Sequence, residues 1–462
     1  MDEITYMSAA ALAEVIRKRQ VSSKEVVERY VQSIEQKNPR INAVVQLAAD
    51  AALAQAEVAD AALARNEVKG PLHGVPVTIK DNLDTAGIIS TGGTQGRAYF
   101  VPEQDATVVA RLKEAGAIVL GKTNTPELTL AYETDNIVYG RTNNPYDPSR
   151  TCGGSSGGSA AILAIGGSPL DIGSDTGGSL RVPSHYCGTA AIRPTSGRVS
   201  RAGHILPPFG ALESLTTIGP MARYVDDLAL TLPIISGADW RDPAVVPMPL
   251  GDYRAVDLKG LRVAVHTDNG VIPPSLDIVQ TVNAAAKALA DAGAIVTEKR
   301  PEGIDQAFGL FLGLLGADNG AGVSTLLHMY NTTEPSPFIV HLGQLLADYA
   351  VNTAEFDALL VKWGMFKIGM LAFMQEYDLI LSPVTSSPAV SHGATFTEEV
   401  LPGFSYTATY NLTGWPAAVV RGGTSDEVLP IGVQVIAAPW REDRVLAAAR
   451  HLETVLGGWQ RP

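Results

Sequence analysis

Two clusters rich in glycine and serine, together with one lysine, carry the residue types from which a hydrolytic site could be built. Ser155 lies in the cluster GGSSGGS, Ser179 lies in GSDTGGS, and Lys80 ends the apolar segment VPVTIK. Glycines beside a serine let the backbone approach a substrate, and successive N–H groups that point into one concavity can stabilise an oxyanion. A lysine desolvated at the end of an apolar strand has a lowered pKa and can serve as a base. These three residues are therefore the candidate catalytic residues.

A phosphate-binding loop is a second interpretation of the sequence, because residues 116–123 match the pattern G-x4-G-K-[ST]. Such a loop needs open backbone between its glycines, and it must follow a strand and open a helix. Here the four residues between Gly116 and Gly121 are themselves an apolar strand, and a predicted helix precedes them. We therefore interpret the pattern as a structural strand and not as a nucleotide site.

A third pattern, G-x-S-x-G at residues 154–158, matches the nucleophile elbow of α/β-hydrolases, with Ser156 at its centre. That elbow needs a strand directly before it, whereas the preceding residues NNPYDPSRTC are turn formers. A serine–histidine site would also need a downstream histidine, and several are uncommitted: His185, His204, His266 and His392. An esterase with Ser156 as nucleophile is kept as an alternative.

The elements that must position these residues alternate between helix and short apolar strand. An alanine-rich helix is predicted over 49–65, and VPVTIK alternates in polarity as a strand does. Further predicted elements are a helix over 105–115, strands over 117–121 and in LRVAVHT, a helix over 277–292, strands in AIVTE, DLILSP, PAAVVR and IGVQVIA, and a helix over 442–456. This alternation is typical of an α/β sheet with helices on both faces.

Length and composition exclude several classes of protein. The 462 residues suggest about three domains of the usual size, although large α/β enzymes can exceed that size as one unit. Hydrophobic residues make up 46% of the chain and charged residues 18%, which excludes a disordered or coiled-coil protein. The net charge of −13 repels phosphate backbones, so no nucleic-acid partner is expected.

The cysteines and the first residues bear on cofactors and location. Cys152 and Cys187 form no CxxC motif and no Cys/His cluster, so we expect neither a metal nor another cofactor. The opening residues MDEITYMSAA lack the basic and apolar regions of a signal peptide. The longest apolar run, residues 307–317, is shorter than the ~20 residues that a bilayer requires. We expect a cytoplasmic protein that has no membrane partner.

Five segments together resemble the amidase signature family: GGSSGGSAA, GSDTGGSLRVPSHYCG, GVPVTIKDN, GKTNTPEL and NLTGWPAAVV. The resemblance runs from about residue 8 to residue 456. It implies a single large α/β domain over 1–462, with a mixed, mostly parallel central sheet flanked by helices on both faces. It also implies a catalytic core at about 70–220 and a variable, substrate-facing stretch at about 300–376.

The resemblance gives each catalytic candidate a role. Ser179 resembles the nucleophile that becomes acylated, and Ser155, held by a cis peptide after Gly154, resembles the bridging serine that relays a proton. Lys80 resembles the base, which must be neutral before attack. A neutral lysine near pH 7 needs a pKa about 3 units below the ordinary 10.4. Asp81 would oppose that shift, but strand alternation is expected to point it to the other side.

The loops around the nucleophile also have counterparts in the family. The backbone N–H groups that resemble the oxyanion hole belong to Thr176, Gly177, Gly178 and Ser179. Asp175 and Arg181 match framework positions that support these loops. A non-catalytic scaffold is disfavoured, because all the catalytic atoms are present.

Three segments depart from the usual family pattern: Ser184-His185-Tyr186, IRPTSGR and SLTTIGP. None of them removes a catalytic atom. We interpret the departures as favouring a stand-alone amidase, similar to aryl acylamidases and urethanases, over the glutamine-using component of an amidotransferase. The alternative is that component, which hydrolyses glutamine and works with a partner chain.

The substrate is expected to be a small amide or carbamate, with esters as a further possibility. Residues expected to line the site are apolar and include no arginine or lysine clamp: Leu130, Tyr132, Ile205, Leu206 and Phe209, with Phe308 and Phe311 in the variable stretch. Such a lining suits aryl or alkyl amides better than charged amino acids. We expect the protein to be a monomer or a homodimer.

Overall fold

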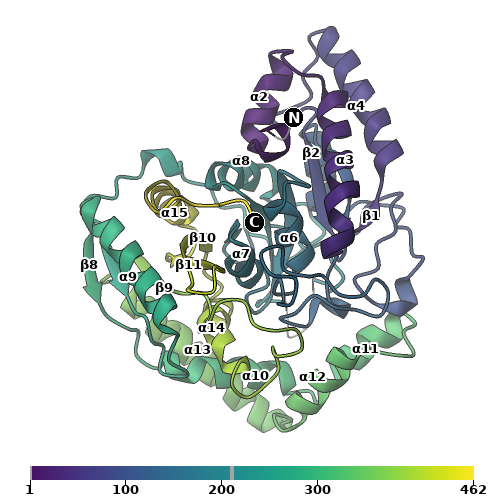
Figure 1. The fold of residues 1–462 in the computed structure, drawn as a ribbon. Helices are drawn as coiled ribbons and strands as arrows, with labels where there is room; N and C mark the ends of the chain where they lie inside the picture. The colour runs from purple at the N-terminus through teal and green to yellow at the C-terminus, as the bar shows by residue number, and fades with distance from the viewer. Residues whose placement is uncertain (1–2, 209–212) are drawn as a thin grey trace.

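One continuous sheet of eleven strands runs through the computed structural model, which describes residues 3–208 and 213–462 (Figure 1). In their order across the sheet, the strands are β1 (Val44–Leu47), β3 (Ile118–Thr123), β2 (Pro76–Lys80), β4 (Leu170–Asp175), β6 (Thr217–Ala222), β5 (Ala190–Arg193), β10 (Ala417–Thr424), β11 (Pro430–Ile436), β9 (Leu379–Pro383), β7 (Arg262–Val265) and β8 (Ile295–Glu298). The expected α/β class and the mixed sheet of a single domain are confirmed.

The expectation that this sheet is mostly parallel is wrong. Among the described strands, parallel pairing joins β2 to β3 and β4, and joins β7 to β8 and β9. The other six of the ten neighbouring pairs are antiparallel. Residues 425–429 illustrate the reason, because five residues between β10 and β11 can form a hairpin but not the crossover that parallel strands need.

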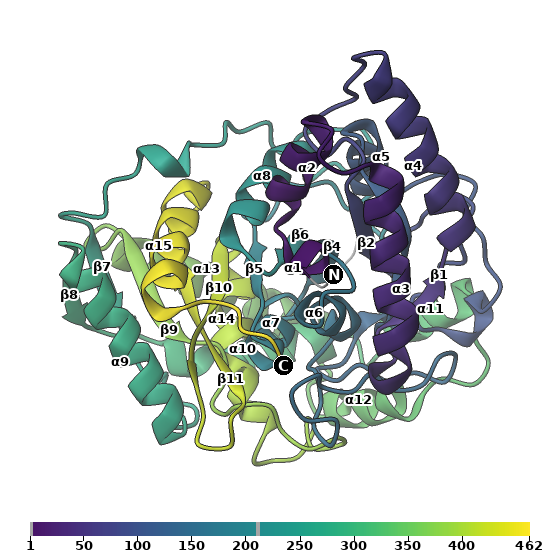
Figure 2. The same cartoon turned by 45° about the horizontal axis from the view of Figure 1, so that its top comes forward.

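Helices lie on both faces of the sheet, as Figures 1 and 2 show. In chain order they are α1 (Glu3–Tyr6), α2 (Ala9–Arg17), α3 (Ser23–Ile41), α4 (Ala49–Ala64), α5 (Thr107–Glu114), α6 (Gly157–Ala164), α7 (Arg181–Cys187), α8 (Val225–Ile235), α9 (Leu276–Asp291), α10 (Ala307–Gly316), α11 (Ala321–Met329), α12 (Pro337–Ala347), α13 (Thr353–Phe373), α14 (Ser405–Thr413) and α15 (Glu442–Leu456). The expected variable stretch forms α10 to α13, and α10, α12 and α11 follow one edge of the molecule in Figure 1.

Three neighbouring strands bring the candidate residues to one edge of the sheet. Every residue of β2, β3 and β4 is buried, as expected for short apolar strands that are covered on both faces. Thr78 pairs in parallel with Asp171, so the carboxyl ends of β2 and β4 lie at the same edge. Lys80 ends β2 there, and the second Gly-Ser cluster follows β4.

Each Gly-Ser cluster leads directly into a helix, and the two helices pack against each other. Helix α6 begins within the first cluster at Gly157, and α7 begins two residues after Ser179. The glycines are needed for close packing: a Cβ at Gly158 would lie 2.4 Å from the backbone nitrogen of Asn124. The sequence therefore sets both serines in short turns between a buried strand or loop and a buried helix.

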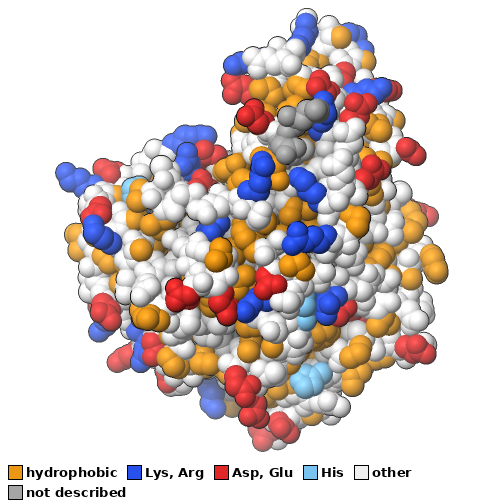
Figure 3. Space-filling model, viewed as in Figure 1, with side chains coloured by type: hydrophobic (Ala, Val, Ile, Leu, Met, Phe, Trp, Pro, Cys, Tyr) orange, Lys and Arg blue, Asp and Glu red, His pale blue; other side chains and the backbone are white. Residues whose placement is uncertain are grey.

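The surface carries no single dominant charge on the face in Figure 3, where acidic, basic and apolar side chains are interspersed. Within the described residues, no single helix has the length and apolar character needed to cross a membrane. One bent pair of segments, Ile304–Gly316 and Ala321–Met329, reaches that length and character when taken together.

Candidate active site

Lys80 and Ser155, which are 75 positions apart in the sequence, meet inside the protein. The fully buried Nζ of Lys80 donates hydrogen bonds to Ser155 Oγ at 2.7 Å and to Ser174 Oγ at 3.2 Å. Burial lowers the pKa of Lys80 well below its ordinary value, although the carboxylates of Asp175 and Asp171 act in the opposite direction. Because a lowered pKa favours the neutral amine, Lys80 can accept a proton.

Asp81 does not share this environment. Its carboxylate accepts from the backbone N–H of Thr91 at 3.1 Å and from the Thr91 hydroxyl. Burial raises the pKa of Asp81 to about 6, and Lys122 opposes that rise. The expected alternation of Lys80 and Asp81 is confirmed. Lys122 itself lies in β3 and donates to Thr85 Oγ1 at 2.8 Å, so the interpretation of the phosphate-loop pattern as a strand is also confirmed.

The first Gly-Ser cluster holds Ser155 and Ser156 in different surroundings. The peptide bond between Gly154 and Ser155 is cis, as the family resemblance implies. Ser156 is fully buried, and its Oγ donates to the carbonyl of Ser174 at 3.2 Å. No strand lies directly before Ser156, which a nucleophile elbow requires. These features contradict the alternative in which Ser156 is the nucleophile of an esterase.

Ser179 lies beside this network and borders a cavity. The backbone N–H of Ser156 donates to the carbonyl of Ser179 at 3.2 Å, which joins the two Gly-Ser clusters. Ser179 is 6% exposed and forms part of the cavity wall together with Thr176 and Gly177. The structure therefore brings the three catalytic candidates to one place, and among them Ser179 faces the space where a substrate could enter.

The oxyanion hole differs from the expected set of four N–H groups. The N–H of Gly178 donates to Asp175 Oδ1 at 2.9 Å, so it is already occupied and the prediction for Gly178 is wrong. Within the described residues, the N–H groups of Thr176, Gly177 and Ser179 have no acceptor. The aspartate competes for the amide of Gly178 because it ends β4 and caps the turn that follows.

Asp175 and Arg181 support this turn as expected. Arg181 donates through Nε to Asp175 Oδ2 and through Nη2 to Asp175 Oδ1, both at 3.0 Å. Arg193 lies 3.7 Å away, and Asn411 donates to Oδ1 at 2.8 Å. Burial alone would raise the pKa of Asp175, but Arg181 and its other partners hold that pKa below its ordinary value. The carboxylate therefore stays ionised and holds the turn.

The same turn is braced by residues from the C-terminal part of the chain. Thr407 Oγ1 donates to the carbonyl of Gly177 at 2.9 Å, and Arg181 Nη1 donates to Gln434 Oε1 at 3.1 Å. Gly178 has a φ of +132°, and a Cβ there would lie 2.4 Å from Thr407 Oγ1. Only glycine fits this position, because both the backbone angle and the space exclude a side chain.

Sequence reasoning missed a second group of polar residues next to Lys80. Asn82 Nδ2 donates to Ser174 Oγ at 2.9 Å, and Asn82 also contacts His204 Nε2 at 2.7 Å. Burial, followed by the charge of Lys80, lowers the pKa of His204 to about 3, so its ring is neutral. Ser174 and Asn82 lie within the quoted motifs, GSDTGGS and GVPVTIKDN, and could have been found there. Nothing in the sequence connects His204 to them.

Comparison with known proteins agrees with this geometry. A family model described as Amidase matches residues 25–446. The chain belongs to the amidase family. A curated relative, the A subunit of glutamyl-tRNA(Gln) amidotransferase from Carboxydothermus hydrogenoformans, is 33% identical to this amidase, with 98% of this chain and 97% of that protein covered.

Solved structures of other enzymes share the fold of this amidase. 6-Aminohexanoate cyclic dimer hydrolase has a TM-score of 0.88 at 27% identity and is covered over 99% of both chains. A bacterial aryl acylamidase of the amidase signature family has a TM-score of 0.86 at 27% identity, with 98% of this chain and 96% of that chain covered. Because the identity to the amidotransferase protein is 33%, the three sequence departures do not separate this amidase from that branch.

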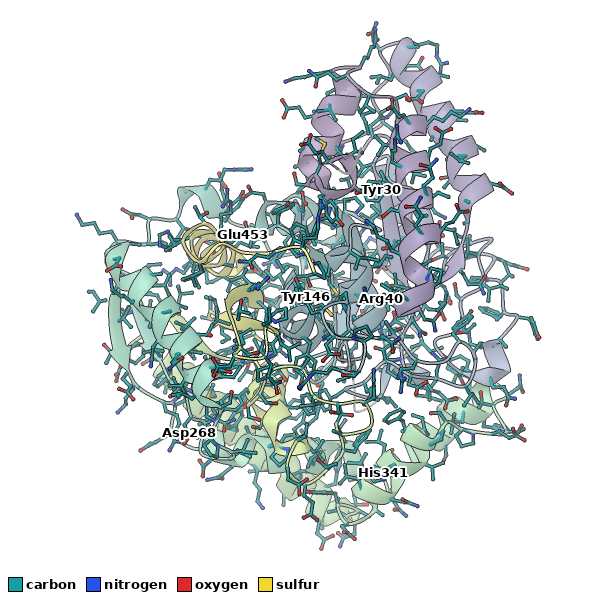
Figure 4. All side chains as sticks on the ribbon, in the orientation of Figure 1. Tyr30, Arg40, Tyr146, Asp268, His341 and Glu453 are labelled. Atoms are coloured by element: carbon teal, nitrogen blue, oxygen red, sulfur yellow. The ribbon has the colours of Figure 1, made fainter. Side chains whose placement is uncertain are left out.

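The cavity beside Ser179 is almost entirely apolar. Besides Thr176, Gly177 and Ser179, its wall consists of Thr129, Leu130, Ala131, Tyr132, Phe311, Leu312, Leu315, Leu342, Leu345, Phe396 and Leu401. Tyr132 stacks on Phe404 with ring centroids 3.9 Å apart and donates to the carbonyl of Gly177 at 3.1 Å. His341, labelled on α12 in Figure 4, packs edge-on against Phe396. The variable helices thus complete the wall opposite the nucleophile.

The expected lining residues have different outcomes. Leu130, Tyr132 and Phe311 lie on the cavity wall. Leu206 borders a second apolar cavity that shares Leu130, Leu315 and Leu342 with the first.

Two of the expected lining residues, Ile205 and Phe308, are buried but lie on the wall of neither cavity. Ile205 is 1% exposed and packs against Leu128 and Gly92, and Phe308 lies in the core around α10. An apolar side chain can line a cavity or pack in the core, and the neighbours of these two hold them in the core. Phe209 lies outside the described residues.

Proposed function

We propose that this amidase hydrolyses small amides with apolar or aryl substituents through an acyl-enzyme formed on Ser179. The observation that carries the proposal is the cavity beside Ser179, in which apolar side chains surround the three candidate oxyanion N–H groups. Within the described residues that form its wall, no side chain is charged. A site of this kind binds apolar groups by burial and leaves the polar contacts to the reacting amide.

The first chemical step moves protons from Ser179 to Ser155 and from Ser155 to Lys80. Ser179 Oγ attacks the carbonyl carbon while its proton passes to Ser155, and the proton of Ser155 passes to the neutral amine of Lys80. The new C–O bond forms as the carbonyl π electrons move onto oxygen. The N–H groups of Thr176, Gly177 and Ser179 are free to donate to that oxyanion, and donors at a developing oxyanion contribute strongly to the rate.

The second step returns the proton. The C–N bond breaks as the ammonium of Lys80 gives its proton, through Ser155, to the departing amine. Water then attacks the acyl-enzyme with Lys80 again serving as base, so that the acid is released and Ser179 is regenerated. The same sequence cleaves a carbamate or an ester, because each also presents a carbonyl carbon and a leaving group.

A second candidate is the glutamine-hydrolysing component of an amidotransferase, which the 33% identity to such a protein favours. Free glutamine carries an ammonium and a carboxylate, and both need polar or charged partners when they are buried. The cavity wall has apolar side chains where glutamine would need these polar or charged partners. The apolar amide is therefore the proposed substrate and glutamine the alternative.

The deciding experiment is a substrate panel on the purified chain alone. Chromogenic anilides, primary amides, aryl carbamates and aryl esters are compared with glutamine at matched concentration. We expect turnover of anilides or aryl carbamates, absent in a Ser179→Ala variant, and no glutaminase activity. Glutaminase activity that appears only after a second protein is added would overturn the proposal in favour of the amidotransferase component.

A further inference from the structure

Residues 127–133 run along the cavity beside Ser179 and carry a buried glutamate at each end. The four residues 129–132 line the cavity, whereas Glu127 and Glu133 are each 1% exposed and are not part of its wall. Within the part of the chain that the structure describes, neither carboxylate forms an ion pair with a lysine or an arginine. Both carboxylates instead bind groups on other segments of the chain.

Glu133 binds the segment that carries Phe396 to the opposite side of the cavity. Its carboxylate accepts a hydrogen bond from the backbone N–H of Gly393 at 2.9 Å and lies 3.1 Å from His392 Nδ1. Thr395 Oγ1 donates to the same carboxylate at 3.4 Å. Three successive positions of the segment that leads to Phe396 are therefore tied to one side chain.

Little else ties this segment to the rest of the protein. Among the described residues, the other hydrogen bond from residues 392–400 to a distant part of the chain is that of His392 Nε2, which donates to the carbonyl of Pro148 at 3.1 Å. The remaining backbone bonds of residues 392–400 are turns within 391–403. Phe396 itself is only half-buried. The position of Phe396 therefore depends strongly on Glu133.

Glu127 holds the start of α12, which continues the same side of the cavity. The backbone N–H of Ser336, the residue directly before the helix, donates to Glu127 Oε2 at 2.6 Å. Thr94 Oγ1 donates to Glu127 Oε1 at 2.7 Å. Helix α12 then contributes Leu342 and Leu345 to the cavity wall. A carboxylate suits this position, because the first N–H groups of a helix lack partners within it.

The two tied segments meet each other at Phe396. Its ring centroid lies 5.2 Å from that of His341 and 5.8 Å from that of Phe338, both of which belong to α12. We call α12 and residues 392–401 together the outer wall. Each half of the outer wall contacts the other half and is tied to residues 127–133 by one buried carboxylate.

The segment between the two glutamates has a backbone conformation that its residues rarely adopt. Leu128 has a φ of +52° and Thr129 a φ of +62°, in the left-handed region that is uncommon for residues with a side chain, above all a β-branched one. Such a conformation persists only where the surroundings impose it, and it is found preferentially at ligand sites. The outer wall is thus tied to a segment that is itself held in place.

We propose that Glu127 and Glu133 are positioning residues for substrate binding, which hold the outer wall in place without touching the substrate. This inference rests on the proposed function, because the group that contacts the outer wall is taken to be the apolar part of the amide. A wall already held in place binds such a group more tightly, since no further ordering is needed on binding. Loss of a tie should therefore weaken substrate binding and leave the chemistry at Ser179 unchanged.

The first test measures kcat and KM separately on an anilide. Glu127→Ala and Glu133→Ala should each raise KM about tenfold and change kcat by less than about twofold. Glu133→Gln should keep a KM close to that of the wild type. Its amide oxygen can accept from the N–H of Gly393 and its NH₂ group can donate to a neutral His392. A fall in kcat at unchanged KM in both alanine variants would overturn the proposal.

A matched control is Asp227→Ala, which removes another buried carboxylate that ties backbone groups. Asp227 is fully buried, accepts from the N–H groups of Ala9 and Ala10 at 2.9 Å each, and is not part of the cavity wall. This variant should lower the melting temperature and leave KM unchanged. An equal rise of KM in Asp227→Ala would show general loosening of the protein and would contradict a positioning role.

A double-mutant cycle tests whether Glu133 acts through Phe396. Phe396→Ala should raise KM by itself, and adding Glu133→Ala should raise it little further, because the ring that Glu133 positions is already absent. Effects on KM that multiply would overturn this assignment. If Glu133→Ala does not fold, His392→Ala replaces it in the cycle, since that side chain is 11% exposed and supplies one of the ties.

Labelling of Ser179 by an aryl fluorophosphonate separates failure of this inference from failure of the proposed function. The concentration at half-maximal labelling rate should rise about tenfold in both alanine variants, whatever the natural substrate is. A wild-type enzyme that hydrolyses no apolar amide would overturn the proposed function. Hydrolysis by the wild type, with KM and labelling unchanged in both alanine variants, would overturn the positioning role alone.

Discussion

Lys80 Nζ lies 2.7 Å from Ser155 Oγ at a place where the lysine is fully buried and the serine is 1% exposed. In water a lysine is charged and solvated. Here the only direct hydrogen-bond partners that the structure gives the amine among the described residues are two hydroxyl groups, those of Ser155 and Ser174. Burial lowers the pKa of this amine, so Lys80 can act as a base toward Ser155. The predictions for Lys80, for the pH profile and for Ser174 follow from this.

Replacing Lys80 should affect amides more than activated esters. Lys80→Met keeps the length of the side chain and removes the amine, so both attack and protonation of the leaving amine lose assistance. We expect the amidase rate to fall by about 10²–10⁴, with a smaller loss for an aryl ester whose phenoxide leaves without a proton. Steady-state rates on a matched anilide and phenyl ester measure the difference. A folded Lys80→Met enzyme that keeps more than about a tenth of its amidase rate contradicts the assigned base.

The pH dependence of kcat/KM should follow the neutral form of Lys80. Because only the neutral amine accepts a proton, the rate should be low at acid pH and rise as pH increases through an apparent pKa. Burial lowers the pKa of Lys80, so this rise should lie well below the 10.4 of a free lysine. Rates on an uncharged anilide, whose own ionisation does not change, give the profile. A rise that occurs only near pH 10 would show that Lys80 remains protonated in the enzyme.

Ser179 should be the residue that reacts with a fluorophosphonate. It borders the cavity, whereas Ser156 is fully buried and its hydroxyl donates a hydrogen bond to the carbonyl of Ser174. We expect mass spectrometry to find the phosphonyl group on Ser179, and Ser179→Ala to remove the labelling. Ser156→Ala serves as the control, since it should still be labelled at Ser179. Labelling that survives in Ser179→Ala and disappears in Ser156→Ala would reverse the two assignments.

The hydroxyl of Ser174 should matter to Lys80 without touching the substrate. Ser174 Oγ accepts from Lys80 and from Asn82, so Ser174→Ala leaves the amine with one acceptor fewer. We expect kcat to fall about tenfold with KM little changed. The rise in the pH profile should move to lower pH, because an acceptor that favours the charged form is lost.

Ser174→Thr, which keeps the hydroxyl, should restore both kcat and the pH profile. A purely structural role for Ser174 would lower thermal stability in the alanine variant and leave the pH profile in place.

Breaking the buried pair of Asp175 and Arg181 should destabilise the whole protein. In Asp175→Asn the guanidinium of Arg181 stays buried but loses its carboxylate partner. Such a loss typically lowers the free energy of unfolding by about 3–5 kcal/mol. The control is Asp147→Asn, which removes a pairing with Arg150 at the surface, where such a pair contributes about 0–1 kcal/mol. Denaturant unfolding of both variants measures the difference. Equal stability of the two variants would contradict the bracing role of Asp175.

The sequence pointed to the candidate catalytic residues because each of them lies in a short, specific motif. Lys80, Ser155 and Ser179 lie in segments whose residue types and spacing are specific, and β2 is predicted as a strand from polarity alone. The strand β4, which precedes Ser179, is not among the predicted strands. The strand directions could not be predicted in this way. A hairpin such as that of β10 and β11 depends on the five residues between them, and the expected helix–strand alternation overlooked it.

The other errors concern contacts made across the fold. That Ile205 belongs to the core depends on Leu128 and Gly92, which come from distant segments. His204 joins Asn82 across 122 positions. No local pattern encodes such pairs, so only the folded chain shows them.

The braces on the nucleophile's turn determine when during synthesis the chain can become active. Lys80, Ser155 and Ser179 leave the ribosome early, whereas the residues that hold the turn, Thr407 and Gln434, are added near the end. A nascent chain that stops before residue 407 has every reactive atom and lacks these supports. Such a chain should be catalytically inactive, and hydrolysis should begin only when translation is nearly complete.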